Sequence, residues 1–318
     1  MVLGFADGSG SHTGSLRGPA KVRCIGAFIG DESAWLDFDK RWNAVLAKPE
    51  WPSQVTRFHS YDCVNQIGEF RDWSYAQRLA IFGDLVGVIV DSPQIIGVGS
   101  SNIIDHFQGL PPADLNLLKS EHLGTPLEIV CQFLFQRIIT RTRERFGESE
   151  QIALTFDNEP APDGDEYSKL YAEYAARYPL SGTLALKSLH FASGKDLPAL
   201  QAADIFSYTT YQWEMDTHYP KNAEPHFPVI PAFLRMVEAI EPEGGRYNLD
   251  GLRGLVSMIK AGKKMQPHPH LQEKSIVCSN VDCGKPFVAV YDTRTPLPDG
   301  ILQRPCPHCQ QSNDVSWP

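Results

Sequence analysis

Four cysteines near the carboxyl end of the chain constrain its fold more than any other feature. They are spaced Cys278-x4-Cys283 and Cys306-x2-Cys309, with 22 residues between the two pairs. Two close pairs suit a tetrahedral thiolate site, because each pair comes from one tight turn and the intervening chain brings the turns together. A segment of this size with few large apolar side chains depends on such a metal to fold. The sequence therefore predicts a zinc ribbon in which these four cysteines bind one structural Zn²⁺.

The second pair also fits another chemistry. Its sequence, Cys-Pro-His-Cys, has the spacing of thiol redox motifs. A redox motif requires a βαβ setting, which the surrounding sequence lacks, and it leaves the first pair unexplained. The remaining cysteines, Cys24, Cys63 and Cys131, stand singly among apolar neighbours and are typical of small buried hydrophobes. Zinc binding is the preferred interpretation, and a reducible Cys306–Cys309 bridge is the alternative.

Length and composition indicate one large domain followed by a small module. The chain has 318 residues, of which 42% are hydrophobic and 21% are charged. We expect a domain over residues 1–262, a linker with alternating proline and histidine over 263–273, and the zinc ribbon over 274–318. No apolar run approaches the roughly 20 residues of a membrane helix, and the first residues lack the pattern of a signal peptide. These observations predict a cytoplasmic protein that does not enter a membrane.

Hydrophobic patterns in the large domain predict strands mixed with helices. Strands are expected over Val2–Ala6, Lys21–Ile29, Gln54–Phe58, Gln94–Gly99, Gln151–Phe156 and Leu184–Phe191. Helices are expected over Asp31–Lys48, Ser74–Val90, Pro126–Phe146, Asp165–Tyr178, Pro198–His218, Ile230–Ile240 and Leu249–Lys260. Such a mixture is typical of an α/β or α+β sheet domain.

Three aspartates occupy positions where a carboxylate needs a partner. Asp7 ends the first strand, Asp157 ends a later buried strand, and Asp204 lies in the middle of an apolar helix. A divalent cation shared among carboxylates is a common way to bury such charges. Taken singly, Asp157 is typical of a turn or cap residue, and Asp204 of an exposed or salt-bridged helix residue. Together, two strand-end aspartates facing one on a helix form the arrangement used in two-metal phosphodiester chemistry.

The net charge limits the kinds of nucleic-acid binding that the chain can support. With 29 basic and 38 acidic residues, its formal net charge is −9. A chain of this charge offers no generally basic surface for tight, nonspecific binding of nucleic acid. The charge is compatible with an acidic metal site, although it does not point to one.

Four sequence blocks, in order along the chain, resemble a family of bacterial proteins. They are FADGSGSHTG, IGAFIGDESAWLDFDKRW, RFHSYDCVNQIGEFRDWSYAQR and LHFASGKDLPALQAADIFSY. Over roughly residues 1–215, the chain is similar to the "domain of unknown function 3800" family. The resemblance implies a ribonuclease-H-like fold, which is an α/β architecture with a mixed sheet flanked by helices. The cysteine-rich end of the chain lies outside the shared region.

The resemblance also implies a set of site residues. Following the order of the family's motifs, they are Asp7, His59, Asp62, Asp157, Lys195, Gln201 and Asp204. In a ribonuclease-H-like site, the aspartates Asp7, Asp157 and Asp204 hold Mg²⁺ or Mn²⁺. His59 would then move a proton or stabilise the product, and Lys195 would neutralise charge on the scissile phosphate.

One departure from the family pattern bears on the metal ligands. Many members carry an acidic residue after the opening aspartate, where this chain has Gly8. Its absence removes one ligand and leaves Glu69 or Glu159 as the candidates for that role. The other readings stay open as well, since His59 alone is typical of a hydrogen-bonded structural histidine and Asp62 of a helix cap.

These observations together predict a metal-dependent nuclease that hydrolyses phosphodiester bonds with an acidic Mg²⁺ or Mn²⁺ site. The expected partner is a nucleic acid, and the zinc ribbon offers a second surface for a protein partner. The alternative is a non-catalytic adaptor or nucleic-acid-binding component of a larger assembly, for example in defence against mobile elements. In that case the fold persists while the ribbon recruits protein or nucleic acid.

Overall fold

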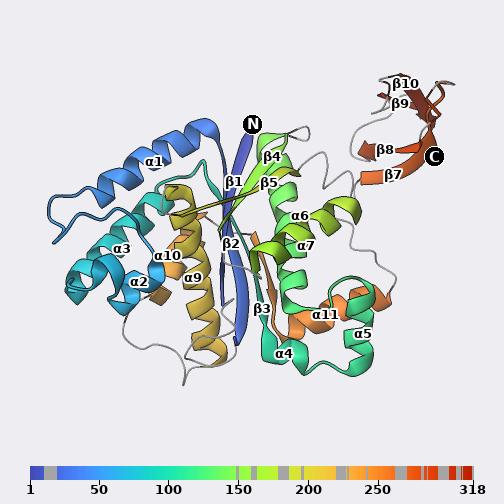
Figure 1. Cartoon of the computed structure of the whole chain (residues 1–318). Coiled ribbons are helices and arrows are strands. Elements are labelled where there is room, and N and C mark those ends of the chain that lie inside the picture. The colour runs from blue at the N-terminus through green and yellow to red at the C-terminus, as the bar shows by residue number, and fades with distance from the viewer. Residues whose placement is uncertain are drawn as a thin grey trace. The chain divides into compact units, whose positions relative to one another are not determined.

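The computed structural model describes residues 1–10, 20–147, 150–158, 163–177, 186–194, 197–219, 227, 229–240, 243–261, 271–280, 283–284, 286–292, 301–305, 309 and 311–316. The chain divides into two compact units, Met1–Lys264 and Met265–Pro318 (Figure 1). Among the described residues, no helix has both the length and the apolar run needed to cross a membrane.

The larger unit alternates strands and helices along the chain. Its strands are β1 (Val2–Ser9), β2 (Val22–Asp31), β3 (Ile96–Ile103), β4 (Ile152–Asp157), β5 (Leu186–Ala192) and β6 (Glu243–Tyr247). Its helices are α1 (Glu32–Leu46), α2 (Ser60–Asn65), the 3₁₀ turn η1 (Gly68–Phe70), α3 (Tyr75–Val90), α4 (Ile104–Gln108), α5 (Pro112–Ser120), α6 (Pro126–Phe146), α7 (Asp163–Arg177), α9 (Pro198–His218), α10 (Val229–Ile240) and α11 (Leu249–Lys260).

The strands of this unit form one mixed sheet in the order β5-β4-β1-β2-β3-β6. The pairs β1–β2 and β2–β3 are antiparallel, whereas β4 lies parallel to β1, β5 parallel to β4, and β6 parallel to β3. The first strand therefore sits in the middle of the sheet, and β1 and β4 end side by side at the same edge. The fold class predicted from the sequence, a mixed sheet flanked by helices, is confirmed.

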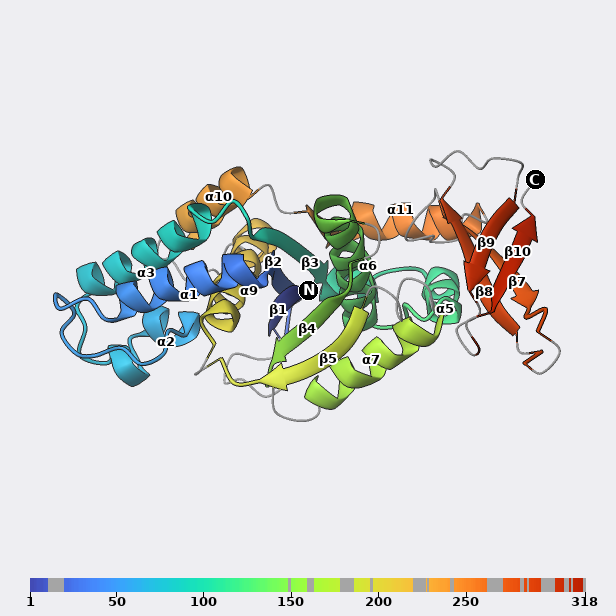
Figure 2. The same cartoon turned by 90° about the horizontal axis from the view of Figure 1, so that it is seen from above.

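Helices cover both faces of the sheet and enclose two apolar cores (Figures 1 and 2). On one face, α1, α3, α9 and α10 bury an aromatic-rich core that includes Trp42 and Trp73. On the other face, α6 and α7 bury a second core that includes Phe135 and Tyr167. Burial of this much aromatic and branched apolar surface is the main source of stability for such a layered domain.

Local sequence determines where the long helices begin. Thr125 caps α6 through a capping box with Glu128, and Pro126 occupies the first helical position, where its missing N–H costs nothing. Ser74 and Gln77 form the same reciprocal cap at the start of α3. These caps satisfy backbone N–H groups that have no partner within the helix.

A buried ion pair joins β6 to the carboxyl-terminal half of α9. Arg246 donates hydrogen bonds from Nε and a terminal nitrogen to both carboxylate oxygens of Glu214, at 2.8–3.0 Å. Glu214 is fully buried and also accepts a 2.7 Å hydrogen bond from Ser101 Oγ. The guanidinium carbon of Arg246 lies 4.1 Å from the ring centroid of Trp213. Because an unpaired buried charge is costly, the Glu214 carboxylate depends on Arg246, whose own side chain is 36% exposed, to stay in the interior.

The structure corrects several predicted element boundaries. The first strand does not end at Ala6 but continues to Ser9, because Gly8 and Ser9 pair with Ile25 and Cys24 of β2. The predicted strand over Gln54–Phe58 is wrong, since this extended segment belongs to no sheet. The helices α4 and α5 and the strand β6 were not predicted.

In the smaller unit, the described strands form two antiparallel pairs. β7 (Leu271–Val277) pairs antiparallel with β8 (Pro286–Asp292), and β9 (Ile301–Pro305) pairs antiparallel with β10 (Ser312–Ser316). Residues 263–270 of the predicted linker lie outside the described part of the chain, and residues 271–273 belong to β7. The β-rich character predicted for this segment is therefore present.

Candidate active site and metal centre

Two of the predicted site residues lie at the ends of adjacent parallel strands. In the β1–β4 ladder, Ala6 pairs with Phe156, so Asp7 and Asp157 follow at neighbouring positions. Ala6 and Phe156 both pack into the core beneath α6 and α7. Because side chains alternate along a strand, Asp7 and Asp157 point to the opposite face, the one covered by α9. The sheet therefore presents two carboxylates side by side at one edge.

Helix α9 brings the third aspartate to the same face. Gly26 pairs with Asp7, and a Cβ atom on Gly26 would lie 2.8 Å from the backbone nitrogen of Ser207. Only glycine permits this close approach between helix and sheet. Ser207 Oγ also lies 3.1 Å from Ser9 Oγ, and Asp204 is one helical turn before Ser207. The negative charge of Asp157 contributes to raising the pKa of Asp204, so the two carboxylates interact electrostatically.

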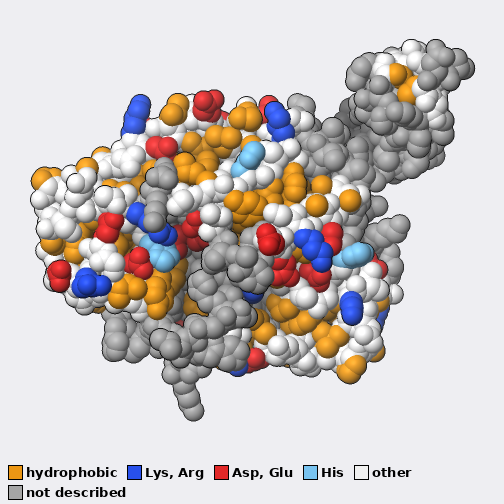
Figure 3. All heavy atoms as spheres, viewed as in Figure 1, with side chains coloured by type: hydrophobic (Ala, Val, Ile, Leu, Met, Phe, Trp, Pro, Cys, Tyr) orange, Lys and Arg blue, Asp and Glu red, His pale blue; other side chains and the backbone are white. Residues whose placement is uncertain are grey.

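His59 lies between two carboxylates. Its Nδ1 is 3.2 Å from Asp62 Oδ1, and its Nε2 is 4.0 Å from Asp204 Oδ1. The other oxygen of Asp204 accepts a 2.6 Å hydrogen bond from the backbone nitrogen of Ser60. Residues 59 and 60, which begin α2, thus hold the imidazole and an N–H group against the same aspartate. Acidic, basic and histidine side chains gather on this part of the surface, over α2 and α9 (Figure 3).

This contact alters the acidity of all three groups. Burial raises the pKa of the Asp204 carboxyl, and the opposing charge of His59 offsets only part of that effect. Burial acts to lower the pKa of His59, but the Asp204 charge and the hydrogen bond to Asp62 together raise it. That hydrogen bond also lowers the pKa of Asp62. A buried carboxylate with a raised pKa is one whose charge a cation would stabilise.

Backbone N–H groups hold the strand-end aspartates. Asp157 Oδ1 accepts hydrogen bonds from the backbone nitrogens of Asn158 and Gly194, each at 2.8 Å. Asp7 Oδ1 accepts one from Gly8 at 2.8 Å. Within the described chain, the oxygens of Asp7, Asp157 and Asp204 do not all lie within 4.8 Å of one another. A single ion bound by all three would therefore draw these side chains closer together.

Gln201 connects the site to its surroundings. Its Oε1 accepts hydrogen bonds from Trp42 Nε1 at 2.9 Å and from the backbone nitrogen of Phe58 at 3.0 Å. Its Nε2 donates to the carbonyl of Gly194 at 2.9 Å. The amide thus joins α1, the segment that carries His59, and the turn that holds Asp157. This geometry fits a positioning residue.

Glu69, one of the two candidates for a fourth carboxylate, is held by another residue. Both oxygens of Glu69 accept hydrogen bonds from Thr56, one from its backbone nitrogen and one from its hydroxyl. These bonds tie η1 to the segment before His59 and occupy the carboxylate. Glu159 and Lys195 lie outside the described residues. Arg57, which was not predicted from the sequence as a site residue, acts electrostatically on both His59 and Asp62.

Three of the four predicted zinc ligands converge in the smaller unit. The sulfur atoms of Cys278, Cys283 and Cys309 all lie within 4.8 Å of one another, and Cys278 Sγ is 3.6 Å from Cys309 Sγ. A tetrahedral site with metal–sulfur bonds of about 2.3 Å has sulfur–sulfur edges of about 3.8 Å, so this spacing fits a thiolate-bound ion. Cys306 lies outside the described residues.

Local structure supports this cysteine cluster. The backbone nitrogens of Cys283 and Gly284 both donate to the carbonyl of Asn280, and Gly284 has φ +52°, a conformation that suits glycine. Buried Asn313 accepts a 2.7 Å hydrogen bond from the backbone nitrogen of Ser279, and its Nδ2 lies 3.9 Å from Cys278 Sγ. A side-chain amide directed at a ligand sulfur is typical of the outer shell of a metal centre.

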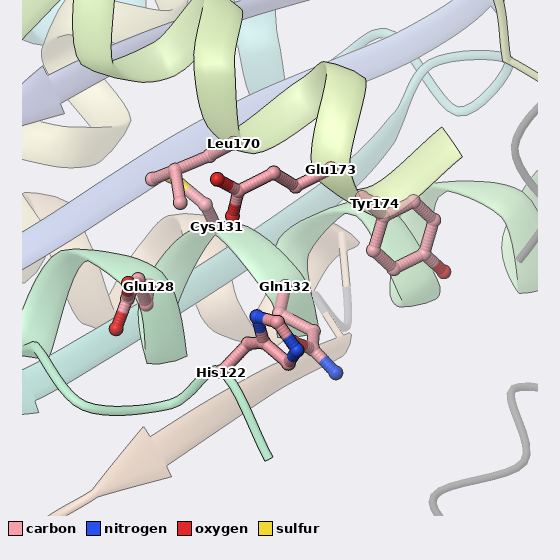
Figure 4. A pocket seen from close by; sticks show the side chains of 7 residues that line it. All are labelled: His122, Glu128, Cys131, Gln132, Leu170, Glu173 and Tyr174. Carbon is pink, nitrogen blue, oxygen red and sulfur yellow. The ribbon is translucent and has the colours of Figure 1, made fainter. Parts of the chain in front are cut away.

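A separate small pocket lies between α6, α7 and the loop that precedes α6 (Figure 4). The residues that line it are His122, Glu128, Cys131, Gln132, Leu170, Glu173 and Tyr174. Figure 4 shows the Glu173 carboxylate beside Cys131, and His122 next to Gln132. This pocket lies on the α6 face of the sheet, whereas the predicted site residues face α9, so it contributes nothing to the candidate active site.

The chain has weak similarity to the solved structures of several ribonucleases H. A ribonuclease HII from Archaeoglobus fulgidus, solved in complex with PCNA, has a TM-score of 0.34 and 12% identity, covering 83% of this chain and 91% of that chain. A ribonuclease H2 from Pyrococcus horikoshii OT3 has a TM-score of 0.33 and 12% identity, covering 75% and 86%. Bst-RNase HIII in complex with Mn²⁺ has a TM-score of 0.34 and 12% identity, covering 83% and 71%.

The chain is thus an α/β protein with a six-stranded mixed sheet and a cysteine cluster near its carboxyl end. Neither a protein-family model nor a curated protein sequence matches it, so the resemblance to the "domain of unknown function 3800" family stays a prediction. Because the TM-scores and identities of the solved structures are low, the assignment of function rests on the residues of this chain.

Proposed function

We propose that the protein is a divalent-metal-dependent nuclease whose site is built from Asp7, Asp157 and Asp204. The observation that carries this proposal is the placement of three carboxylates, from two adjacent parallel strands and one helix, on the same face of the sheet. Asp204 is 8% exposed and its pKa is raised mainly by burial. Such a group gains most from a nearby cation, and carboxylate oxygens are the ligands that Mg²⁺ and Mn²⁺ prefer.

The residues around the aspartates suit hydrolysis of a phosphodiester bond. When bound, Mg²⁺ or Mn²⁺ activates water and stabilises the leaving oxygen. His59, held between Asp62 and Asp204, is placed to accept or return a proton at its Nε2. Gln201 positions the segment that carries His59, and Lys195 is assigned to the charge of the scissile phosphate.

The cysteine cluster has a different role in this proposal. Cys278, Cys283 and Cys309, with Cys306 as the fourth ligand, would hold a structural Zn²⁺. A site closed by four thiolates has no open position for substrate, so it supports folding of the smaller unit and not catalysis. The surface of this unit is then available to nucleic acid or to a protein partner.

We expect Asp204→Asn to lower the rate of Mn²⁺-dependent cleavage by about 100-fold or more, equivalent to about 2.7 kcal/mol. The test compares wild type and variant on labelled single-stranded and duplex RNA and DNA. Asp84→Asn is a matched control, because Asp84 is a half-exposed helix residue paired with Lys48 outside the site. Full activity of Asp204→Asn would contradict the site assignment.

The same substitution should not unfold the protein. The Asp204 pKa is raised in the folded state, so its carboxyl favours folding at pH values below its unfolded pKa and loses that contribution as pH rises through the folded pKa. At neutral pH its charge therefore opposes folding, and removing it should leave the melting temperature unchanged or higher. Loss of activity without loss of stability would separate a catalytic role from a structural one.

One observation favours a second candidate, a non-catalytic adaptor. In the described chain, the three carboxylates do not come within 4.8 Å as a group, and backbone N–H groups already satisfy one oxygen of Asp157. Calorimetric titration with Mn²⁺ discriminates between the candidates. Binding that Asp204→Asn abolishes supports the nuclease, whereas the absence of Mn²⁺ binding outside the cysteine cluster favours the adaptor.

A further inference from the structure

The segment that leads into α2 is held by its backbone and directs alternate side chains outward. The backbone nitrogens of Thr56, Phe58 and Ser60 donate to Glu69, Gln201 and Asp204 respectively. Phe58 and Ser60 are buried, at 1% and 0% exposure. Arg57 and His59 are half-exposed, and Tyr61 at the start of α2 is 41% exposed. Arg57, His59 and Tyr61 are called the outer ridge below.

Arg57 stands out because its guanidinium has no hydrogen-bond or ion-pair partner among the described residues. Its Nε is buried and unpaired, and yet its charge acts on both His59 and Asp62. The Nε atoms of Arg41 and Arg78 are also buried without a hydrogen bond, but the terminal nitrogens of these two arginines have partners. Arg78 donates to the carbonyls of Cys63 and Val64, and Arg41 donates to the carbonyl of Asp91 and to Ser92 Oγ.

An unpaired arginine beside an acidic site has a clear chemical use. A guanidinium presents a planar fork of N–H donors that matches the oxygens of a phosphate. In a chain with a net charge of −9, general attraction does not bring a polyanion to the surface. A cation next to the carboxylates would therefore help to determine where the phosphate backbone is held.

Tyr61 adds a second element of recognition. Its ring is exposed, and its centroid lies 6.4 Å from that of His59. Exposed aromatic rings next to a cationic track bind unpaired bases by stacking, and this mode tolerates any base sequence. A duplex keeps its bases stacked on one another, so a single protruding tyrosine selects for unpaired nucleotides.

We propose that the outer ridge binds single-stranded nucleic acid, with Arg57 contacting a backbone phosphate and Tyr61 stacking on an adjacent base. This proposal rests on the nuclease function above and names the substrate class of the same site. The outer ridge positions the bound nucleic acid, whereas Asp7, Asp157 and Asp204 form the site that cleaves it.

The test is equilibrium binding of a fluorescently labelled, single-stranded oligonucleotide, followed by anisotropy. All proteins carry Asp204→Asn so that no cleavage occurs, and no Mg²⁺, Mn²⁺ or chelator is added. Arg57→Met should weaken binding about tenfold and reduce the slope of log K against log salt by about 0.7, the value for one phosphate contact on a single strand. Tyr61→Leu should weaken binding at least about fivefold with no change in that slope. A duplex of the same sequence should bind more weakly than the single strand.

Two controls separate this role from a structural one. Arg253→Met removes the same charge from an exposed position on α11 and should leave binding unchanged. Because Arg57 makes no hydrogen bond within the described chain, Arg57→Met should keep the wild-type melting temperature, and Arg57→Lys should restore part of the affinity. Binding that is unchanged by both Arg57→Met and Tyr61→Leu would overturn the proposal.

The binding and cleavage experiments distinguish failure of the outer-ridge proposal from failure of the nuclease proposal. If the wild type cleaves but Arg57→Met binds normally, the ridge proposal is wrong and the nuclease stands. If Arg57→Met weakens binding but the wild type cleaves nothing with Mn²⁺, the ridge stands and the nuclease is wrong. If the protein neither binds nor cleaves, both are wrong.

Discussion

Replacing Arg246 by methionine is expected to lower the free energy of unfolding of the larger unit by about 3–5 kcal/mol. The substitution leaves the Glu214 carboxylate fully buried without its bidentate partner. Ser101 Oγ supplies one hydrogen bond, and His218 Nε2 lies 3.4 Å away, but neither replaces the guanidinium. Methionine retains most of the packing against Trp213, so the loss of stability measures chiefly the effect of removing the positive charge. Urea unfolding followed by tryptophan fluorescence measures the effect.

Two further variants test whether the loss of stability comes from the charge of Arg246. Arg253→Met removes an arginine whose side chain is 68% exposed and whose contact with Asp250 is 4.0 Å long, so it should change stability by no more than about 0.5 kcal/mol. The double variant Arg246→Met/Glu214→Leu removes both charges and should recover much of the lost stability, because a buried pair is often replaceable by apolar residues. If Arg246→Met and the double variant were equally unstable, the effect would come from packing.

Cys278→Ser is expected to abolish metal binding by the smaller unit and to unfold its hairpins. Structural Zn²⁺ contributes about 10–16 kcal/mol to small thiolate-bound modules, far more than the apolar core of such a unit can replace. Cys278 is 4% exposed and its sulfur lies 3.6 Å from that of Cys309, so this ligand is central to the cluster. Metal analysis should find one zinc per wild-type chain and none in the variant. Amide hydrogen exchange should show loss of protection in β7–β10 while the larger unit is unchanged.

Matched substitutions test the ligand set. Ser279→Ala alters the neighbouring residue but keeps every thiol, and the backbone nitrogen that bonds to Asn313 remains; it should bind zinc like the wild type. Cys306→Ser should behave like Cys278→Ser, since the sequence predicts Cys306 as the fourth ligand. An ordered smaller unit in metal-free Cys278→Ser would contradict the zinc-ribbon interpretation.

Patterns that depend on neighbours in sequence were predicted well. The apolar residues of α1 recur at helical spacing and are the ones that the helix buries, including Trp35, Phe38 and Trp42. The strand end at Asp157 was also predicted, whereas β1 continues past Asp7 to Ser9. These features arise from local periodicity and from residues that end strands, and both can be read from a single sequence.

Features that depend on distant contacts were predicted poorly. Gln54–Phe58 has strand-like composition, but its N–H groups bond to the side chains of Glu69 and Gln201, so it joins no ladder. The strand β6 consists of Glu-Gly-Gly-Arg-Tyr, which has low strand propensity and is extended because it pairs with β3. Arg57 was not predicted as a site residue for a similar reason, because the sequence does not show whether an arginine has a hydrogen-bond partner in the fold.

The position of α9 late in the chain has a consequence for synthesis. Asp7 is synthesised almost 200 residues before Asp204 and the bridging amide of Gln201. Until α9 packs against β1 and β2, Asp7 and Asp157 have no helix above them, and the segment carrying His59 lacks its hydrogen bonds to Gln201 and Asp204. Domains fold as units while the chain emerges. A nascent chain that ends before α9 would therefore carry Asp7, His59 and Asp157 without the helix that completes the proposed site.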